Sequence, residues 1–138
     1  MSVVYSIEIN AHASKIFALY TNIHSWPIWD SEVSAVHLPG LHLGVSGWLK
    51  PRQGPKSNIH VAEVVPNRSF TIESRLPLCR MQFGHELEGD ENRTTVTHWV
   101  RFTGPLAFLF RQLIGKGIAQ TLPKTLAGLK RASEAQGK

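Results

Sequence analysis

The sequence GPLAFLFRQLIGKGIAQTLPKTLAGLKRASE, residues 104–134, has the pattern of one long amphipathic helix. Pro105 suits the first helical position, because its missing N–H would have no intrahelical partner there. Burying a large apolar side chain contributes roughly 1.5–3 kcal/mol, so we expect this helix to lie on an apolar surface that the preceding residues supply. The apolar residues of the predicted face recur at steps of three or four: Leu106, Leu109, Phe110, Leu113, Ile114, Ile118, Leu122, Leu126 and Leu129.

The residues ahead of this helix predict an antiparallel sheet. Side chains from Val3 to Ile9 alternate between apolar and polar, as in a half-buried strand. Residues 11–20 predict a short helix capped by Ser14 or Asn10, and Pro27 begins a second helical turn. Further strand patterns follow, separated by short turns: 32–38, 47–52, 57–65, 68–75, 78–88 and 93–103.

This order of elements predicts a two-layer α+β fold. We expect a curved antiparallel sheet of six or seven strands around the C-terminal helix, with two short helices after the first strand. The length of 138 residues predicts a single domain over residues 1–138. Cys79 is the one cysteine; it is expected to be a small core residue and is typical of a reducing compartment. We find no signal peptide and no apolar run of about 20 residues, and we expect a cytoplasmic protein.

The excess of positive charge belongs to the last quarter of the chain. Residues 1–104 contain nine Lys or Arg and nine Asp or Glu, whereas residues 105–138 contain six Lys or Arg and one Glu, which gives the net charge of +5. The ordinary interpretation is a solvated helix face, and the functional one is attraction to an anionic membrane surface. Nucleic acid is not expected as a partner, because no aromatic residues interleave with the basic ones.

The two longest predicted strands place two histidines on the apolar face of the sheet. A hairpin loop of two to four residues pairs His98 with either Phe83 or His85. In both registers the two imidazoles are neighbours. The inward side chains are Cys79, Met81, Phe83, His85 and Leu87 on the first strand and Thr94, Val96, His98, Val100 and Phe102 on the second.

Three roles are consistent with His85 and His98. Each ring can hydrogen-bond a neighbour or a water in a filled core, since an unpaired buried polar group costs about 1–3 kcal/mol. Alternatively, the rings orient a ligand in an apolar cavity, or they transfer protons as a general acid and base. They are only weak candidates for catalysis. No metal site or cofactor is expected, because the sequence has no HxH, HExxH, Cys/His cluster, GxGxxG or Walker loop.

We expect the tryptophans and His60 to have mainly structural positions. Trp26 and Trp29 are expected to fill the core. Trp99 and His60 are expected to point outward from the sheet. Trp48 is consistent with either a core position or a ligand contact.

Together, these features resemble the START-related, Bet v 1-like superfamily, in particular its bacterial polyketide cyclase/dehydrase and lipid-transport type. The resemblance covers nearly the whole chain, and it implies a helix-grip fold with an apolar cavity between the sheet and the terminal helix. It implies no particular activity, because this fold hosts binders, transporters and cyclases. The motifs that carry it, in order, are AHASKIF at 11–17, SWPIWD at 25–30, EVVPNRSF at 63–70, FGHELE at 83–88, VTHWV at 96–100 and GPL at 104–106.

The leading functional hypothesis is binding, transport or sequestration of a hydrophobic or aromatic small molecule in that cavity. One alternative is a polyketide cyclase- or dehydratase-like enzyme that uses the two histidines. Another is a module that contacts a membrane or a protein through the basic helix and Trp99. Under each hypothesis we expect a monomer or a homodimer. Gly115, Gly117 and Pro123 weaken the helix, and we expect this to let it shift and admit a ligand. The predicted ligand-binding residues are His85, His98, Phe83, Met81, Val100, Trp48 and Leu113.

Overall fold

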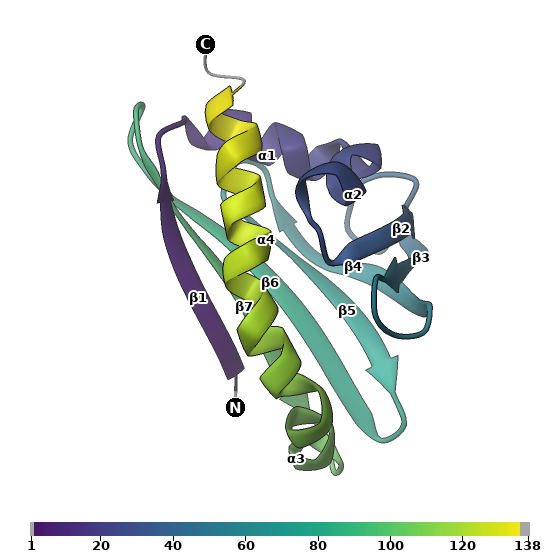
Figure 1. The fold of residues 1–138 in the computed structure, drawn as a ribbon. Coiled ribbons are helices and arrows are strands. Elements are labelled where there is room, and N and C mark those ends of the chain that lie inside the picture. Colours follow the sequence, from purple (N-terminus) through teal and green to yellow (C-terminus); the bar gives the residue numbers. More distant parts are fainter. Residues whose placement is uncertain (1, 136–138) are drawn as a thin grey trace.

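A computed structural model describes residues 2–135, which form a seven-stranded antiparallel sheet with a long helix lying across one face (Figure 1). Two short helices, α1 (Ala13–Thr21) and α2 (Trp26–Trp29), follow the first strand and are joined by a 3-10 turn, η1 (Ile23–Ser25). The predicted helix-grip fold is therefore confirmed. The strands are β1 (Ser2–Ile9), β2 (Val33–His37), β3 (Ser46–Pro51), β4 (Ser57–Val65), β5 (Ser69–Leu76), β6 (Cys79–Gly89) and β7 (Thr94–Thr103).

The strand order in the sheet is β1-β7-β6-β5-β4-β3-β2, so the last strand, β7, pairs with the first strand, β1. β6 and β7 pair with His85 directly opposite His98, which is the second of the two predicted registers. On the other side of β7, Tyr5 of β1 lies opposite His98. Paired residues point to the same side of a sheet. We call the side that packs against the helices the inner face and the opposite side the outer face.

The C-terminal helix is irregular in its first turns. It consists of α3 (Ala107–Phe110), a π-helical turn η2 (Arg111–Gly115) and α4 (Lys116–Ala135), which follow one another directly. Leu122, Leu126 and Leu129 of the predicted apolar face are buried. Leu109 and Leu113 were predicted on the same face, but they are 38% and 70% exposed. No helix within residues 2–135 has the length and hydrophobicity of a membrane span.

The sequence of the first turns explains why Leu109 and Leu113 are exposed. Each is followed directly by another large apolar residue, Phe110 and Ile114, and one face of a helix cannot bury both members of such a pair. Phe110 and Ile114 pack against Cys79 and other inner-face residues of β6 and β7. The neighbouring leucines therefore point away from the sheet.

The second half of the helix is held by a close backbone approach to α2. A Cβ atom on Gly128 would lie 1.9 Å from the carbonyl oxygen of Trp29, so only glycine fits there. Close by, Thr125 Oγ1 donates a 2.9 Å hydrogen bond to Asp30 Oδ1. Trp26 and Trp29 are buried in the same core, as predicted. These contacts fix where α4 crosses the sheet.

Helix α1 is capped by a residue that the sequence pattern did not single out. His12 is its N-cap, and Nδ1 of this histidine accepts a 3.1 Å hydrogen bond from the backbone N–H of Ser14. The prediction of Ser14 or Asn10 as the cap was therefore wrong. An imidazole acceptor at this position performs the task that a serine or aspartate oxygen usually performs.

Candidate functional site

Two histidines and a tyrosine meet on the inner face of the sheet. Tyr20 comes from α1, His85 from β6 and His98 from β7. Tyr20 Oη lies 2.8 Å from His98 Nε2, and the ring centres of His85 and His98 are 4.5 Å apart. Tyr20 and His98 are almost completely buried. The structure thus brings the two predicted histidines together and adds Tyr20 to them.

Phe70 of β5 holds His85 in one orientation. The two rings are stacked, with centres 3.8 Å apart and planes within 3° of each other. Nδ1 of His85 lies 3.1 Å from the carbonyl oxygen of Phe70. Because a carbonyl oxygen can only accept, this nitrogen carries the hydrogen and donates it. His85 Nε2 is left with a free lone pair and has no hydrogen-bond partner within residues 2–135.

Burial keeps all three groups neutral near pH 7. Desolvation lowers the pKa of His85 to about 4, although the bond to Phe70 opposes the change. Desolvation, with a smaller contribution from His85, lowers the pKa of His98 well below its ordinary value. Burial raises the pKa of Tyr20 well above 10.0. Since a general acid or base is most effective when its pKa is near the working pH, these neutral groups are better suited to hydrogen bonding than to proton transfer.

The inner face is incompletely covered along the middle of β6. Met81, Phe83 and His85 share the buried side of the strand, yet each remains partly accessible, whereas their neighbour Val100 on β7 is buried. Figure 1 shows that the helix runs over β1 and β7 and leaves the lower part of β5 to its side. We call Ser74 of β5, which pairs with Met81, together with Met81, Phe83 and His85, the inner patch.

The inner patch combines apolar surface with two polar atoms that lack partners. Ser74 is 1% exposed, and its hydroxyl has no hydrogen-bond partner among the described residues. His85 Nε2 also has no hydrogen-bond partner among the described residues, but it is not sealed from solvent as Ser74 Oγ is. A buried polar atom without a partner normally has an unseen one, such as a water or a ligand. An apolar surface with a few convergent polar groups is the usual composition of a small-molecule site.

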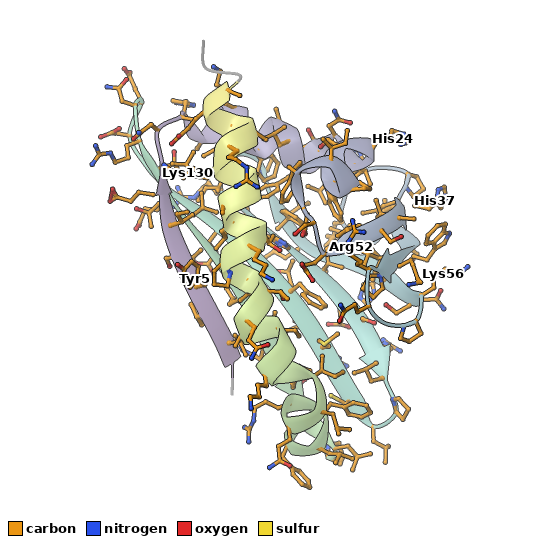
Figure 2. All side chains as sticks on the ribbon, in the orientation of Figure 1. Tyr5, His24, His37, Arg52, Lys56 and Lys130 are labelled. Carbon is orange, nitrogen blue, oxygen red and sulfur yellow. The ribbon has the colours of Figure 1, made fainter. Side chains whose placement is uncertain are left out.

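Two of the predicted ligand-binding residues lie away from this patch. Leu49 of β3 packs against the core, so the adjacent Trp48 points to the outer face. The Trp48 ring centre lies 6.2 Å from that of His37 and 4.8 Å from Lys56 Nζ. Figure 2 shows His37 and Lys56 at the side of the molecule away from the long helix. Leu113 lies near the start of the C-terminal helix, in η2, and points to solvent.

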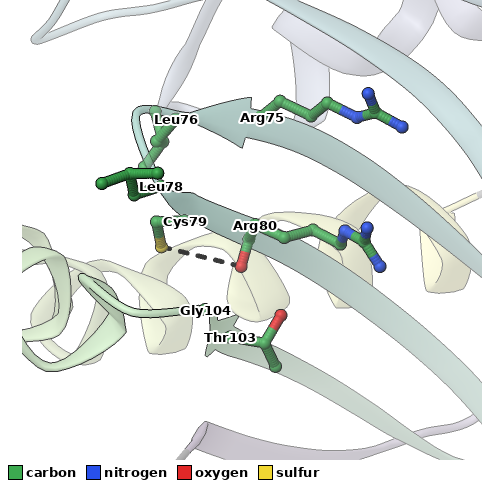
Figure 3. Close-up of a pocket in the computed structure, with 7 residues that line it drawn as sticks. All are labelled: Arg75, Leu76, Leu78, Cys79, Arg80, Thr103 and Gly104. Carbon is green, nitrogen blue, oxygen red and sulfur yellow. Dashed lines mark hydrogen bonds between the residues drawn. The ribbon is translucent and has the colours of Figure 1, made fainter.

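Two further hollows are formed at the surface, and the second of them shares His85 with the inner patch. One of about 440 Å³ is formed at the β5–β6 turn and the end of β7, where Arg75, Arg80 and Thr103 line it together with Leu76 and Leu78 (Figure 3). The other, of about 280 Å³, is lined mainly by polar residues of β4 to β7. Neither is lined by a residue of the C-terminal helix. Neither hollow therefore corresponds to the cavity predicted between the sheet and the C-terminal helix.

The outer face carries polar pairs. His60 Nε2 lies 3.3 Å from Glu73 Oε2, which confirms that His60 points outward. Trp99 Nε1 donates a 2.8 Å hydrogen bond to Glu86 Oε2, so Trp99 also lies on this face, as predicted. Within residues 2–135, no group of three or more His, Cys, Asp or Glu side chains is arranged to hold a metal ion.

Sequence patterns missed three residues that build the site. Tyr20 lies in the short helix predicted over residues 11–20, but the partner of its hydroxyl was not predictable because it depends on how that helix crosses the sheet. Phe70 was not recognised as the support of His85 because the two belong to different strands. Ser74 could have been found, since it alternates with Phe70 and Ile72 along β5 and so shares their inner face.

Comparison with known proteins places these features in a family context. The model of the family described as polyketide cyclase / dehydrase and lipid transport matches residues 1–134. No curated protein sequence matches the chain.

Several solved structures share the fold. The Zhui aromatase/cyclase from Streptomyces sp. R1128 has a TM-score of 0.80 at 12% identity, over 100% of this chain and 96% of that one. A protein from Mesorhizobium loti has a TM-score of 0.74 at 18% identity, over 95% of each chain. A truncated norcoclaurine synthase from Thalictrum flavum has a TM-score of 0.73 at 9% identity, over 96% of this chain and 92% of that one. At such identities the likeness shows the fold alone.

Proposed function

The chain belongs to the polyketide cyclase/dehydrase and lipid transport family, and we propose that it binds a hydrophobic or aromatic small molecule against the inner patch. The observation that carries this proposal is the partial accessibility of Met81, Phe83 and His85 on the face of the sheet that packs against the helices. A ligand that covers apolar surface gains about 25 cal/mol for each Å² removed from water. The family membership supports such a role without specifying the ligand.

We assign the polar anchor of the ligand to His85. Its Nε2 accepts hydrogen bonds only, because the hydrogen of the neutral ring is held on Nδ1 by the Phe70 carbonyl. The matching ligand group is therefore a donor, such as a hydroxyl or a phenol. Because His85 is partly accessible, a donor on the ligand replaces a water at Nε2 and fixes the orientation of the ligand.

Ser74 gives the proposed site a second polar end. It pairs with Met81, four residues along β6 from His85, which corresponds to about 13 Å of strand. Ser74 Oγ can both donate and accept. The proposed ligand is thus an elongated apolar molecule with a donor at the His85 end and a polar group of either kind near Ser74.

The start of the C-terminal helix is the proposed point of entry. The π-helical turn ends at Gly115, and a Cβ atom on that glycine would meet Phe102 at 3.9 Å. Such turns are less stable than regular helix and are frequent at functional sites. This local weakness supports the expectation that the helix shifts around Gly115, Gly117 and Pro123 to admit a ligand.

A cyclase- or dehydratase-like enzyme is the second candidate function. The buried bond between Tyr20 and His98 favours it, because a phenol and an imidazole can pass a proton between them. The lowered pKa values of both histidines weigh against it at neutral pH. We therefore rank binding above catalysis.

Two probes that differ only in a hydrogen-bond donor test the binding proposal. Calorimetric titration should show that 2-naphthol binds more tightly than 2-methoxynaphthalene. His85→Phe should abolish that preference while the weaker binding remains, and Met81→Trp should weaken both probes at least tenfold by filling the patch. Trp48→Phe is the matched control and should change neither. Binding of 2-naphthol that is unchanged in both His85→Phe and Met81→Trp would overturn the proposal.

A further inference from the structure

One end of the molecule exposes four large apolar side chains. Leu78 lies on the β5–β6 turn, and Phe108, Leu109 and Leu113 lie at the start of the C-terminal helix; they are 66%, 58%, 38% and 70% exposed. The two segments are joined by a hydrogen bond from Leu106 N to Leu78 O of 3.0 Å. We call the four exposed residues the apolar tip. Exposed apolar side chains gathered at one end of a molecule are candidates for a contact with another molecule or with a membrane.

Leu78 is both exposed and strained. It follows Pro77 in a two-residue turn between β5 and β6, and its φ is +51°. In turns that begin with proline, a positive φ at the next position is typical of glycine or asparagine. A leucine here is unfavourable for the backbone and for solvation alike. Such an outlier supports a role of the side chain outside folding.

The charged residues in the two segments that carry the apolar tip are all basic. Arg75, Arg80, Arg111 and Lys116 lie in its segments, and residues 74–85 and 93–133 contain no Asp or Glu. Arg75 and Arg80 also line the 440 Å³ hollow beside Leu78 (Figure 3). Arg80 pairs with Glu73 at 3.5 Å, whereas Arg75, Arg111 and Lys116 form no ion pair within residues 2–135.

We propose that this end of the molecule binds the surface of an anionic lipid membrane. Leu78 and Phe108 enter the boundary between headgroups and acyl chains, and the surrounding cations contact the anionic headgroups. Exposed apolar side chains beside Lys and Arg are the combination that such a surface attracts, and Glu73, the acidic residue that pairs with Arg80, is itself buried. A second copy of the chain fits less well, because a two-fold contact through this end would bring like charges together.

Vesicle flotation tests the proposal with the full chain. The protein should float with vesicles of phosphatidylcholine and phosphatidylglycerol, and not with phosphatidylcholine alone. Leu78→Gly is the most informative variant, because it relieves the positive φ and removes the apolar side chain together. It should raise the melting temperature and lower the vesicle partition coefficient. Phe108→Ser should lower the partition coefficient as well.

Matched controls use exposed residues away from the tip. Ile28→Ser on α2, where Ile28 is 85% exposed, should leave vesicle binding unchanged. Arg111→Glu should lower the partition coefficient roughly 25-fold. Each basic residue near an anionic surface contributes about a factor of five, and a charge reversal also adds a repulsion of similar size. Lys124→Glu, at an exposed position further along the same helix, should have a much smaller effect.

Three results would overturn the proposal. The first is equal flotation with neutral and anionic vesicles. The second is unchanged flotation of both Leu78→Gly and Phe108→Ser. The third is no flotation at all together with a concentration-dependent dimer that Leu113→Ser dissociates, which would assign the apolar tip to a subunit contact. Each result is independent of naphthol binding at the inner patch, so the two proposals can fail separately.

Discussion

Tyr20 Oη and His98 Nε2 form a 2.8 Å hydrogen bond between residues 78 positions apart in the sequence. The bond connects α1 to the middle of β7. It gives Nε2 of a buried imidazole a phenol as its partner, so this nitrogen needs no water in the core. The same contact brings the Tyr20 ring to 5.5 Å from that of His85, between centres.

Removing the Tyr20 hydroxyl should destabilise the fold. Tyr20→Phe leaves His98 Nε2 buried without a partner, and we expect the free energy of unfolding to fall by about 1–3 kcal/mol. Urea denaturation measures this change. Tyr5→Phe is the matched control, because Tyr5 lies opposite His98 on β1 but is 41% exposed; it should cost less than about 0.5 kcal/mol. Equal losses in the two variants would contradict the importance of the buried bond.

The lowered pKa of His85 predicts a loss of stability in mild acid. The folded value of about 4 lies below the ordinary 6.5, so the unfolded chain binds more protons between these pH values. The free energy of unfolding should therefore decrease as the pH falls from about 6.5 to about 4, by at most about 3 kcal/mol from this group. His98 changes stability in the same direction.

Comparison with a variant isolates the contribution of His85. Asp30, whose pKa burial raises, acts in the opposite direction, so the wild-type curve alone mixes several groups. Urea denaturation at pH values from 4 to 8 should give a shallower pH dependence for His85→Gln than for the wild type. Parallel curves for the two proteins would show that His85 is not held neutral by burial.

Most of the fold was predictable because its signals are local. Alternation of apolar and polar residues identified the strands, and the hairpin between β6 and β7 left only two registers, of which His85 opposite His98 is the observed one. The exposure of Leu109 and Leu113 was not predictable from the three- to four-residue spacing of apolar residues alone. The sequence shows two apolar residues per turn there, but which of them meets the sheet depends on the π-helical turn.

The site was predictable only where it lies on paired strands. His85, His98, Phe83, Met81 and Val100 share the inner face because strand parity is a property of the sequence. Residues contributed by other layers were not predictable, since their positions depend on how helices cross the sheet. Tyr20 and the exposed leucines of the last helix belong to that class.

Gly84 should resist substitution because Trp99 lies against it. The two residues pair across β6 and β7, and a Cβ atom on Gly84 would lie 1.8 Å from the Trp99 ring. Gly84→Ala must displace the indole and break its bond to Glu86, which should cost about 1–3 kcal/mol, as overpacking does.

A double variant shows whether this clash, or the backbone of β6 itself, makes Gly84 resist substitution. In Gly84→Ala combined with Trp99→Ala, the clash is absent, so the cost of Gly84→Ala measured in that background should nearly vanish. Denaturation of the four proteins of this cycle supplies the coupling energy. An unchanged cost in the Trp99→Ala background would mean that the backbone at Gly84, and not the indole, requires glycine.

Two glycines of α4 should respond to alanine in opposite directions. Helix propensity alone favours alanine at both by about 0.8–1 kcal/mol. A Cβ atom on Gly117 would meet nothing within 4 Å, so Gly117→Ala should stabilise the protein by about that amount. A Cβ atom on Gly128, by contrast, would lie 1.9 Å from the carbonyl oxygen of Trp29, so Gly128→Ala must push α4 away from α2. We expect a net loss of about 2 kcal/mol or more in denaturation, and stabilisation by both variants would show that α4 does not approach α2 as closely as described.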